Sequence, residues 1–148
     1  ARIFSIYEGT TQLQVVAAIR YVTNGTYLGI IKEMLEKEVA PEFQALKDRV
    51  AKMVEKYEDA INYVKAAGNN DLHDFLARRL YEMTAEIIMS LLILDDATRA
   101  PELFAKSANV YVRYAEGTVA GHYAYIKEFK AEDLADFLAA APEEAPAE

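Results

Sequence analysis

Apolar residues recur at helical spacing along most of the chain. In one stretch they stand three or four positions apart, at Phe43, Leu46, Val50, Met53, Tyr57, Ile61 and Val64. A second stretch repeats the spacing at Leu72, Leu76, Leu80, Met83, Ile87, Leu91 and Leu94. Such steps place the side chains on one face of a helix. The pattern predicts two long amphipathic helices. Gly68 ends the first, the cluster at residues 69–71 caps the second, and the pair Asp95-Asp96 closes it.

A third long helix is expected from Pro101 to about Lys127. Proline suits the first position of a helix, and an acidic residue at position 102 complements the helix dipole. We expect its apolar side to carry the aromatic residues Phe104, Tyr111, Tyr114 and Tyr125. Gly117 and Gly121 lie one turn apart, which would let a neighbouring helix approach closely.

Shorter elements flank these helices. Residues 1–9 read as a short extended or irregular lead-in. Thr11 and Gln14 then form a capping box for a helix that runs to about Val22. The Asn24-Gly25 pair predicts a turn before a second short helix over residues 26–38, and Pro41 marks a new start. A last short helix is expected near residues 132–139, and residues 142–148 contain only Pro, Ala and Glu, which predicts a disordered tail.

These elements predict an all-α fold, an antiparallel up-down helical bundle. Each long helix has about 25 residues and is therefore about 38 Å long, and short connections between equal lengths favour antiparallel neighbours. The first two helices do not obviously belong to the bundle. Apolar residues occur on more than one side of the first helix, which indicates packing partners beyond this chain. These residues are Val15, Val16, Ile19 and Val22.

Composition narrows the class of protein. The chain has 148 residues, 53% of them hydrophobic and 27% charged, which indicates one folded unit. A net charge of −8 without a basic cluster disfavours nucleic acid. No apolar run is long enough to span a membrane, and the absence of cysteine fits a cytoplasmic protein. Because the chain starts at Ala1 rather than Met, we expect it to be a piece of something longer.

The lead-in and first helix carry a recognisable motif. Residues 6–14 read IYEGTTQLQ, and Ala-Ile-Arg follows at 18–20. This stretch resembles the C-terminal active-site motif of the flavin-dependent acyl-CoA dehydrogenases, in which Tyr-Glu-Gly-Thr precedes Gln-x-Gln and an Ala-Arg. The arginine that usually follows the second Gln is Val15 here. More loosely, residues 75–94 and 104–123 resemble the helical domain appended to a bacterial branch of this family.

The resemblance implies specific roles. Glu8 would be the catalytic base, Thr10 and Gln12 would lie against FAD, and Tyr7 and Gly9 would lie near the substrate. The partners implied are an acyl-CoA, an electron-transfer flavoprotein and further copies of the chain. The domain division would be 1–25 for the end of the catalytic helical domain, 26–40 for a connecting helix, 41–141 for the appended bundle and 142–148 for an acidic tail. The fragment alone is expected to be inactive.

A separate argument for Glu8 as the catalytic base rests on the chemistry of the residues around it. A carboxylate that removes a proton α to a thioester carbonyl needs a raised pKa, and desolvation raises it from about 4.3. Ile6 and Tyr7 supply apolar neighbours, and Gly9 lets the backbone bend towards a ligand. The alternative is a solvent-exposed glutamate before a helix N-terminus, which the helix dipole stabilises.

Other candidates point to ordinary structure. His73 lies among acids at a helix start, where a solvated side chain outweighs a metal ligand, and His122 is expected to be packed or to face a partner. The tyrosines at helical spacing are expected at the edge of the core with hydrated hydroxyls. A metal or haem bundle is disfavoured because inward Glu-x-x-His pairs are lacking. The remaining alternative is a stand-alone helical interaction or dimerisation module, in which the motif is incidental.

Overall fold

The computed structural model describes residues 18–137. The first described residues, 18–23, are the end of a helix. The later elements are α3 (Thr26–Glu36), the 3-10 helix η1 (Pro41–Phe43), α4 (Gln44–Ala67), α5 (Asn70–Arg99), α6 (Pro101–Glu128) and the 3-10 helix η2 (Ala131–Asp136). These described residues form no strand. The expected disordered tail lies outside them.

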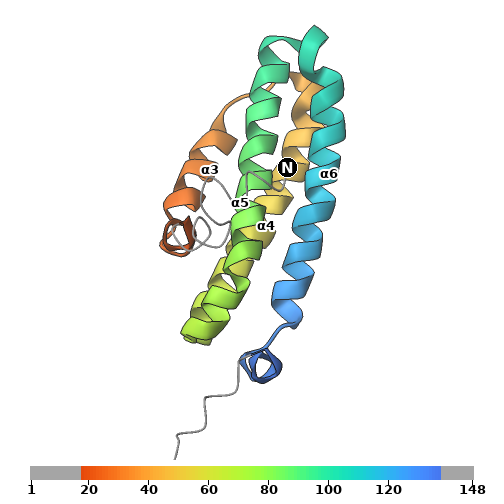
Figure 1. Ribbon diagram of the computed structural model, residues 1–148. Helices are drawn as coiled ribbons and strands as arrows, with labels where there is room; N and C mark the ends of the chain where they lie inside the picture. The colour runs from red at the N-terminus through yellow and green to blue at the C-terminus, as the bar shows by residue number, and fades with distance from the viewer. Residues whose placement is uncertain (1–17, 138–148) are drawn as a thin grey trace, which may run out of the picture.

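Three long helices form the body of the molecule. Helices α4, α5 and α6 run down, up and down beside one another, while α3 lies along the outer side of α5 (Figure 1). They have 24, 30 and 28 residues and are therefore about 36 to 45 Å long. The prediction of an all-α antiparallel up-down bundle is confirmed.

The turns between the long helices use the expected residues. Gly68 adopts a left-handed conformation with φ 61° and ends α4. The Asn69 side chain accepts a hydrogen bond from the backbone N–H of Leu72 at 3.0 Å and so caps α5. Pro101 occupies the first turn of α6, which begins directly after Ala100. Local sequence chemistry thus determines both reversals of the chain.

Two predicted helix ends are wrong. Helix α5 continues past the Asp95-Asp96 pair to Arg99, whose guanidinium pairs with the Asp95 carboxylate one turn back at 2.6 Å. Helix α3 ends at Glu36 rather than at residue 38. There the Lys37 carbonyl instead accepts a hydrogen bond of 2.7 Å from Lys47 Nζ of α4. At the place of the last short helix, expected near residues 132–139, a 3-10 helix covers Ala131–Asp136, and residues 138 and 139 lie outside the described part of the chain.

Helix α6 buries small residues rather than the expected aromatic ones. Its buried positions are Ala108, Val112, Ala115, Val119 and Ile126. Tyr114 is 60% exposed, whereas the other three aromatic residues of the expected face are only partly buried. Gly117 and Gly121 are exposed, and a Cβ added at either would meet no atom within 4 Å. The expected close approach of another helix at these glycines is therefore absent within the described residues.

The first two helices join the core of the bundle. Val22 and Ile31 are fully buried, and Ile19 is 6% exposed. All three belong to the same apolar cluster as the buried residues of α4 and α5. The apolar face of the first helix is thus covered, at least at Ile19 and Val22, by this chain itself. Val15 and Val16 lie outside the described residues.

One tyrosine lies deeper than expected. Tyr57 is fully buried, and its hydroxyl shares a hydrogen bond of 2.6 Å with Thr84 Oγ1. Burial raises the pKa of Tyr57 to about 12. The bond joins α4 to α5 in the middle of the core and satisfies a polar group that would otherwise be costly to bury. The prediction of a hydrated hydroxyl is wrong at this position.

Truncation of a buried side chain in the middle of α5 tests this core. Leu80 is fully buried, so Leu80→Ala should lower the free energy of unfolding by about 2 to 5 kcal/mol through lost burial and a new cavity. Leu103→Ala is the matched control, because Leu103 is 69% exposed and should change stability by about 0.5 kcal/mol or less. Urea unfolding followed by circular dichroism measures both. Equal losses of stability in the two variants would show that Leu80 does not lie in the core.

Candidate functional site

The predicted motif residues precede the described part of the chain. Tyr7, Glu8, Gly9, Thr10 and Gln12 all lie before residue 18, so the structure does not test their roles. The capping pair Thr11 and Gln14 lies outside the described residues as well. What the structure describes is the helical segment 18–23, which contains the last motif residues 18–20 and is called the motif helix below, and its attachment to the bundle.

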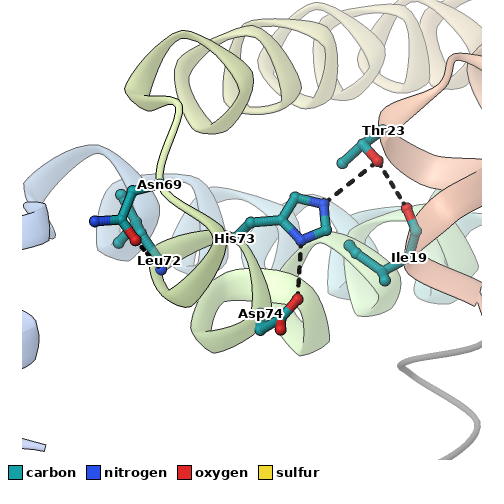
Figure 2. Close-up of polar contacts among 6 residues, drawn as sticks. All are labelled: Ile19, Thr23, Asn69, Leu72, His73 and Asp74. Carbon is teal, nitrogen blue, oxygen red and sulfur yellow. Dashed lines mark hydrogen bonds and ion pairs between the residues drawn. The ribbon is translucent and has the colours of Figure 1, made fainter. Parts of the chain in front are cut away.

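The end of the motif helix is held against the start of α5 (Figure 2). Thr23 Oγ1 donates a hydrogen bond to the carbonyl of Ile19 at 3.1 Å. The same oxygen lies 3.4 Å from His73 Nε2, and His73 Nδ1 lies 3.1 Å from the Asp74 carboxylate. His73 therefore links α5 to the helical segment 18–23, through a threonine 50 residues earlier in the sequence. Together with the burial of Ile19 and Val22, this contact positions the motif helix relative to the bundle.

This arrangement gives His73 a structural role. Its two ring nitrogens contact a threonine hydroxyl and one carboxylate. In the part of the chain that the structure describes, no group of three or more His, Asp or Glu side chains is placed to hold a metal ion. The sequence indicated a solvated helix start here but did not reveal the contact with Thr23, because helix packing alone brings the two residues together.

A polar cluster occupies the groove between α5 and α6. Glu82 lies between two partners: Arg78 Nε at 2.8 Å and His122 Nε2 at 2.9 Å. The guanidinium of Arg79 stacks over the ring of Tyr125, 3.5 Å from its centroid, and its Nη1 lies 3.4 Å from His122 Nδ1. These side chains, apart from His122, line with Phe75 a hollow of about 310 Å³.

The surroundings of His122 favour its neutral form. Burial lowers the pKa of His122, and the nearby Glu82 carboxylate only partly offsets this effect. In the tautomer that fits both contacts, Nε2–H donates to Glu82 and Nδ1 accepts from Arg79. His122 is thus a packed histidine, one of the two alternatives that the sequence left open. Arg78 and Glu82 are visible in the sequence as a pair one turn apart, whereas the partnership with His122 depends on the rotation of α6.

Tyrosine hydroxyls tie α6 to the other two long helices. Tyr111 donates to the Glu86 carboxylate at 2.7 Å, and burial together with this bond raises the pKa of Tyr111. Tyr123 donates to Asp59 at 2.7 Å, and Lys127 pairs with the same carboxylate at 3.0 Å. Both contacts lower the pKa of Asp59, with the tyrosine bond as the larger cause. These hydroxyls serve packing and are not arranged as a reaction centre.

None of the helices within residues 18–137 carries an apolar stretch long enough to cross a bilayer.

Comparison with known proteins identifies the family of this bundle. Residues 23–134 match the sequence model described as acyl-CoA dehydrogenase C terminal. This chain belongs to that family. Comparison with curated protein sequences found no match. A solved structure, the crystal structure of the acyl-CoA dehydrogenase family protein from Porphyromonas gingivalis, aligns with a TM-score of 0.72 and 37% identity. The alignment covers 77% of this chain and 98% of that chain.

The family match covers the bundle, whereas the motif precedes it in the sequence. Because the alignment spans nearly all of the Porphyromonas gingivalis chain, that solved chain is little more than the helical bundle itself. The family match begins at residue 23, after the motif residues 6–20. The motif and the bundle therefore point to acyl-CoA dehydrogenases through different parts of the sequence. The resemblance noted from the sequence is confirmed at the level of the C-terminal family.

The partly buried His122 of the acyl-CoA dehydrogenase bundle predicts a pH effect. Since the folded-state pKa of His122 is lowered, the unfolded chain binds a proton more readily, and stability should fall as the pH drops below about 6.5. His122→Gln keeps a donor for Glu82 but cannot titrate. We expect this variant to lose less stability than the wild type between pH 7 and pH 5. Urea midpoints at both pH values test this, and equal losses in the two proteins would contradict it.

Proposed function

We propose that this chain is the C-terminal part of a flavin-dependent acyl-CoA dehydrogenase. The full-length enzyme would carry out α,β-dehydrogenation of acyl-CoA thioesters, with Glu8 as the base. The single observation that supports this most is an adjacency in the sequence. The Tyr-Glu-Gly-Thr motif at residues 7–10 stands directly before a bundle whose match to the acyl-CoA dehydrogenase C-terminal family begins at residue 23. A chance motif would not be expected at this place.

Glu8 would take the α proton of the substrate. The proton next to a thioester carbonyl is weakly acidic, so its removal requires a carboxylate in reach, oriented and more basic than usual. The apolar neighbours Ile6 and Tyr7, together with bound substrate, would desolvate the carboxylate and raise its pKa towards the working pH. Tyr7 and Gly9 would line the substrate, and Gly9 lets the backbone approach it closely.

The attachment of the motif helix supports this assignment. Ile19 and Val22 are buried in the bundle, and Thr23 contacts His73. The bundle therefore fixes the C-terminal end of the helix that follows Glu8. A catalytic base needs a stable position relative to its substrate, because small displacements cost large factors in rate. The appended bundle would serve the reaction through this anchor and not through residues that touch the substrate.

The cofactor of the full-length enzyme would be FAD, held in part by Thr10 and Gln12. When bound, FAD supplies the acceptor for the hydride that leaves the β carbon. Two neutral hydrogen bonds contribute about 1 to 3 kcal/mol net, which is less than the cost of association. Thr10 and Gln12 would orient the flavin, whereas most of its enclosure would come from other parts of the enzyme.

The remaining assignments follow from the same proposal. Residues 1–25 would complete the catalytic helical domain, 26–40 would connect it to the appended bundle at 41–141, and 142–148 would form an acidic tail. An electron-transfer flavoprotein would reoxidise the enzyme, which would act as a homo-oligomer in the cytoplasm. A second role as an interaction module is favoured by one observation, the exposed apolar side chains Leu103, Val110 and Tyr114 on α6.

The fragment by itself should neither bind flavin nor react. Equilibrium dialysis of residues 1–148 against FAD should show no stoichiometric uptake, because a flavin needs a site that encloses it and buries most of its surface, and other parts of the enzyme would supply most of that enclosure. The same protein should not reduce a dye acceptor when acyl-CoA is added. Uptake of one FAD per chain would contradict the assignment of this chain as part of a larger catalytic unit.

Substitution of the proposed base tests the mechanism. In the full-length enzyme, Glu8→Gln keeps the size and hydrogen bonding of the side chain but removes the proton acceptor. Flavin reduction by acyl-CoA should slow by about a hundredfold or more, while substrate binding persists. Stopped-flow absorbance measures the reduction rate. Glu102→Gln is the matched control on the exposed start of α6 and should leave the rate unchanged. A normal rate in Glu8→Gln would exclude Glu8 as the base.

A further inference from the structure

Helix α6 presents an uncharged stripe on the side opposite the core. Its members stand alternately four and three residues apart, and all are exposed: Leu103, Ser107, Val110, Tyr114, Gly117, Gly121 and Ala124. Leu103 is 69%, Val110 71% and Tyr114 60% exposed. Alternation of four and three is the spacing of a helix–helix seam in coiled coils. We call this set of seven residues the outer stripe of α6.

The outer stripe is unusual for a surface helix. Helix α6 already buries its other face against α4 and α5, through five positions from Ala108 to Ile126. A helix with one buried face ordinarily carries charged residues on the opposite side. Here, nothing charged occurs on the outer stripe from Leu103 to Ala124. A helix that is apolar on both faces has a second packing partner in most folded proteins.

We propose that the outer stripe pairs with the same stripe of a second copy of this chain, with the two α6 helices antiparallel. The order of side-chain sizes favours this occupant. The large members, Val110 and Tyr114, precede the glycines, Gly117 and Gly121. An antiparallel pair with its two-fold axis between Tyr114 and Gly117 sets Tyr114 against the partner's Gly117. The same register sets Val110 against the partner's Gly121 and Ser107 against the partner's Ala124.

A parallel pair fits less well. It would set Tyr114 against the partner's Tyr114 and leave glycine opposite glycine, with crowding at one level and a gap at the next. Close packing disfavours both. The stripe is therefore complementary to itself only when one helix is reversed, which is the requirement for a symmetric two-fold interface. An added Cβ at either glycine meets no atom within 4 Å in this chain, so both positions are open to a partner's side chain.

The charges beside the outer stripe contribute little to the antiparallel arrangement, which rests on the order of side-chain sizes. Arg113 flanks the stripe next to the axis and has no ion-pair partner among the described residues. The antiparallel register brings it to within about two residues, or 3 Å along the axis, of the level of the partner's Glu116, which pairs with Arg49 at 2.5 Å in its own copy. Two like-charge approaches occur in this register. Lys106 approaches the partner's Lys127, which pairs with Asp59 at 3.0 Å in its own copy, and Glu102 approaches the partner's Glu128.

The area of the stripe predicts a weak dimer. From residue 103 to 124 the stripe is about 32 Å long and about 10 Å wide, which gives a footprint of about 300 Å² per copy. Stable interfaces bury about 800 Å² per partner. The isolated chain should therefore dimerise only at high concentration. Disulfide cross-linking can detect such a weak dimer. The chain contains no cysteine of its own that would interfere.

Single cysteines in the outer stripe give the test. In the antiparallel register, residue 117 of one chain lies about 4.5 Å along the axis from residue 117 of the partner. The two residues 103 lie about 37 Å apart along the axis. A disulfide needs Cα atoms within about 7 Å. Gly117→Cys should therefore form a disulfide-linked dimer under mild oxidation, about tenfold or more faster than Leu103→Cys, which is the matched exposed control.

A mixed experiment checks the register. Val110→Cys and Gly121→Cys proteins, mixed at equal concentration, should form the mixed dimer faster than either forms a dimer with itself. Equal cross-linking of Gly117→Cys and Leu103→Cys would indicate random collision or a parallel pair and would overturn the proposal. Absence of cross-linking in every variant at millimolar concentration would overturn it as well. Because none of these variants involves Glu8, either result leaves the proposed dehydrogenase function untouched.

Discussion

The packing of the small residues of α6 against α4 and α5 is the contact on which the rest of the structure depends. Ala108 and Ala115 lie on the buried side with Val112 and Val119, so small and β-branched side chains form the contact face of α6 in this stretch. Small residues at a contact permit short distances between helix axes. This contact determines the rotation of α6, and the rotation determines what its other sides present. It places His122 beside Arg79 and Glu82, and it turns the outer stripe to the surface.

The bundle is also joined to the helix that bears the motif. Val22 and Ile31 are as deeply buried as the central residues of the long helices. Thr23 and His73 add a polar contact near the N-terminal end of α5 (Figure 2). Apolar burial supplies most of the stabilisation, while the polar contact restricts the geometry. The bundle is in this way connected to the segment that we propose carries the base.

Two separate parts of the sequence indicate the same family. The motif at residues 6–20 was recognisable because catalytic chemistry requires particular residue types at short spacing. The bundle was recognisable only loosely, since many sequences satisfy the same pattern of apolar positions. Its assignment rests on the family match over residues 23–134 and on the Porphyromonas gingivalis structure at 37% identity. The roles of Glu8, Thr10 and Gln12 rest on the motif and on the proposal built from it.

Local sequence by itself determined the helices and their reversals. The three-and-four spacing, Gly68, the Asn69 cap and Pro101 predicted α4, α5 and α6 because each signal acts within one or two turns of backbone. Only the tertiary structure decided which face of α6 is buried. The aromatic residues of α6 suggested one face, but alanine and valine fit closer to the neighbouring helices, and partly exposed tyrosines can keep their hydroxyls bonded to Glu86 and Asp59. The same holds for the end of α3 and for the pairing of His122. Each depends on side chains from distant segments, whose approach is set by packing over the whole bundle and not by neighbours in the chain.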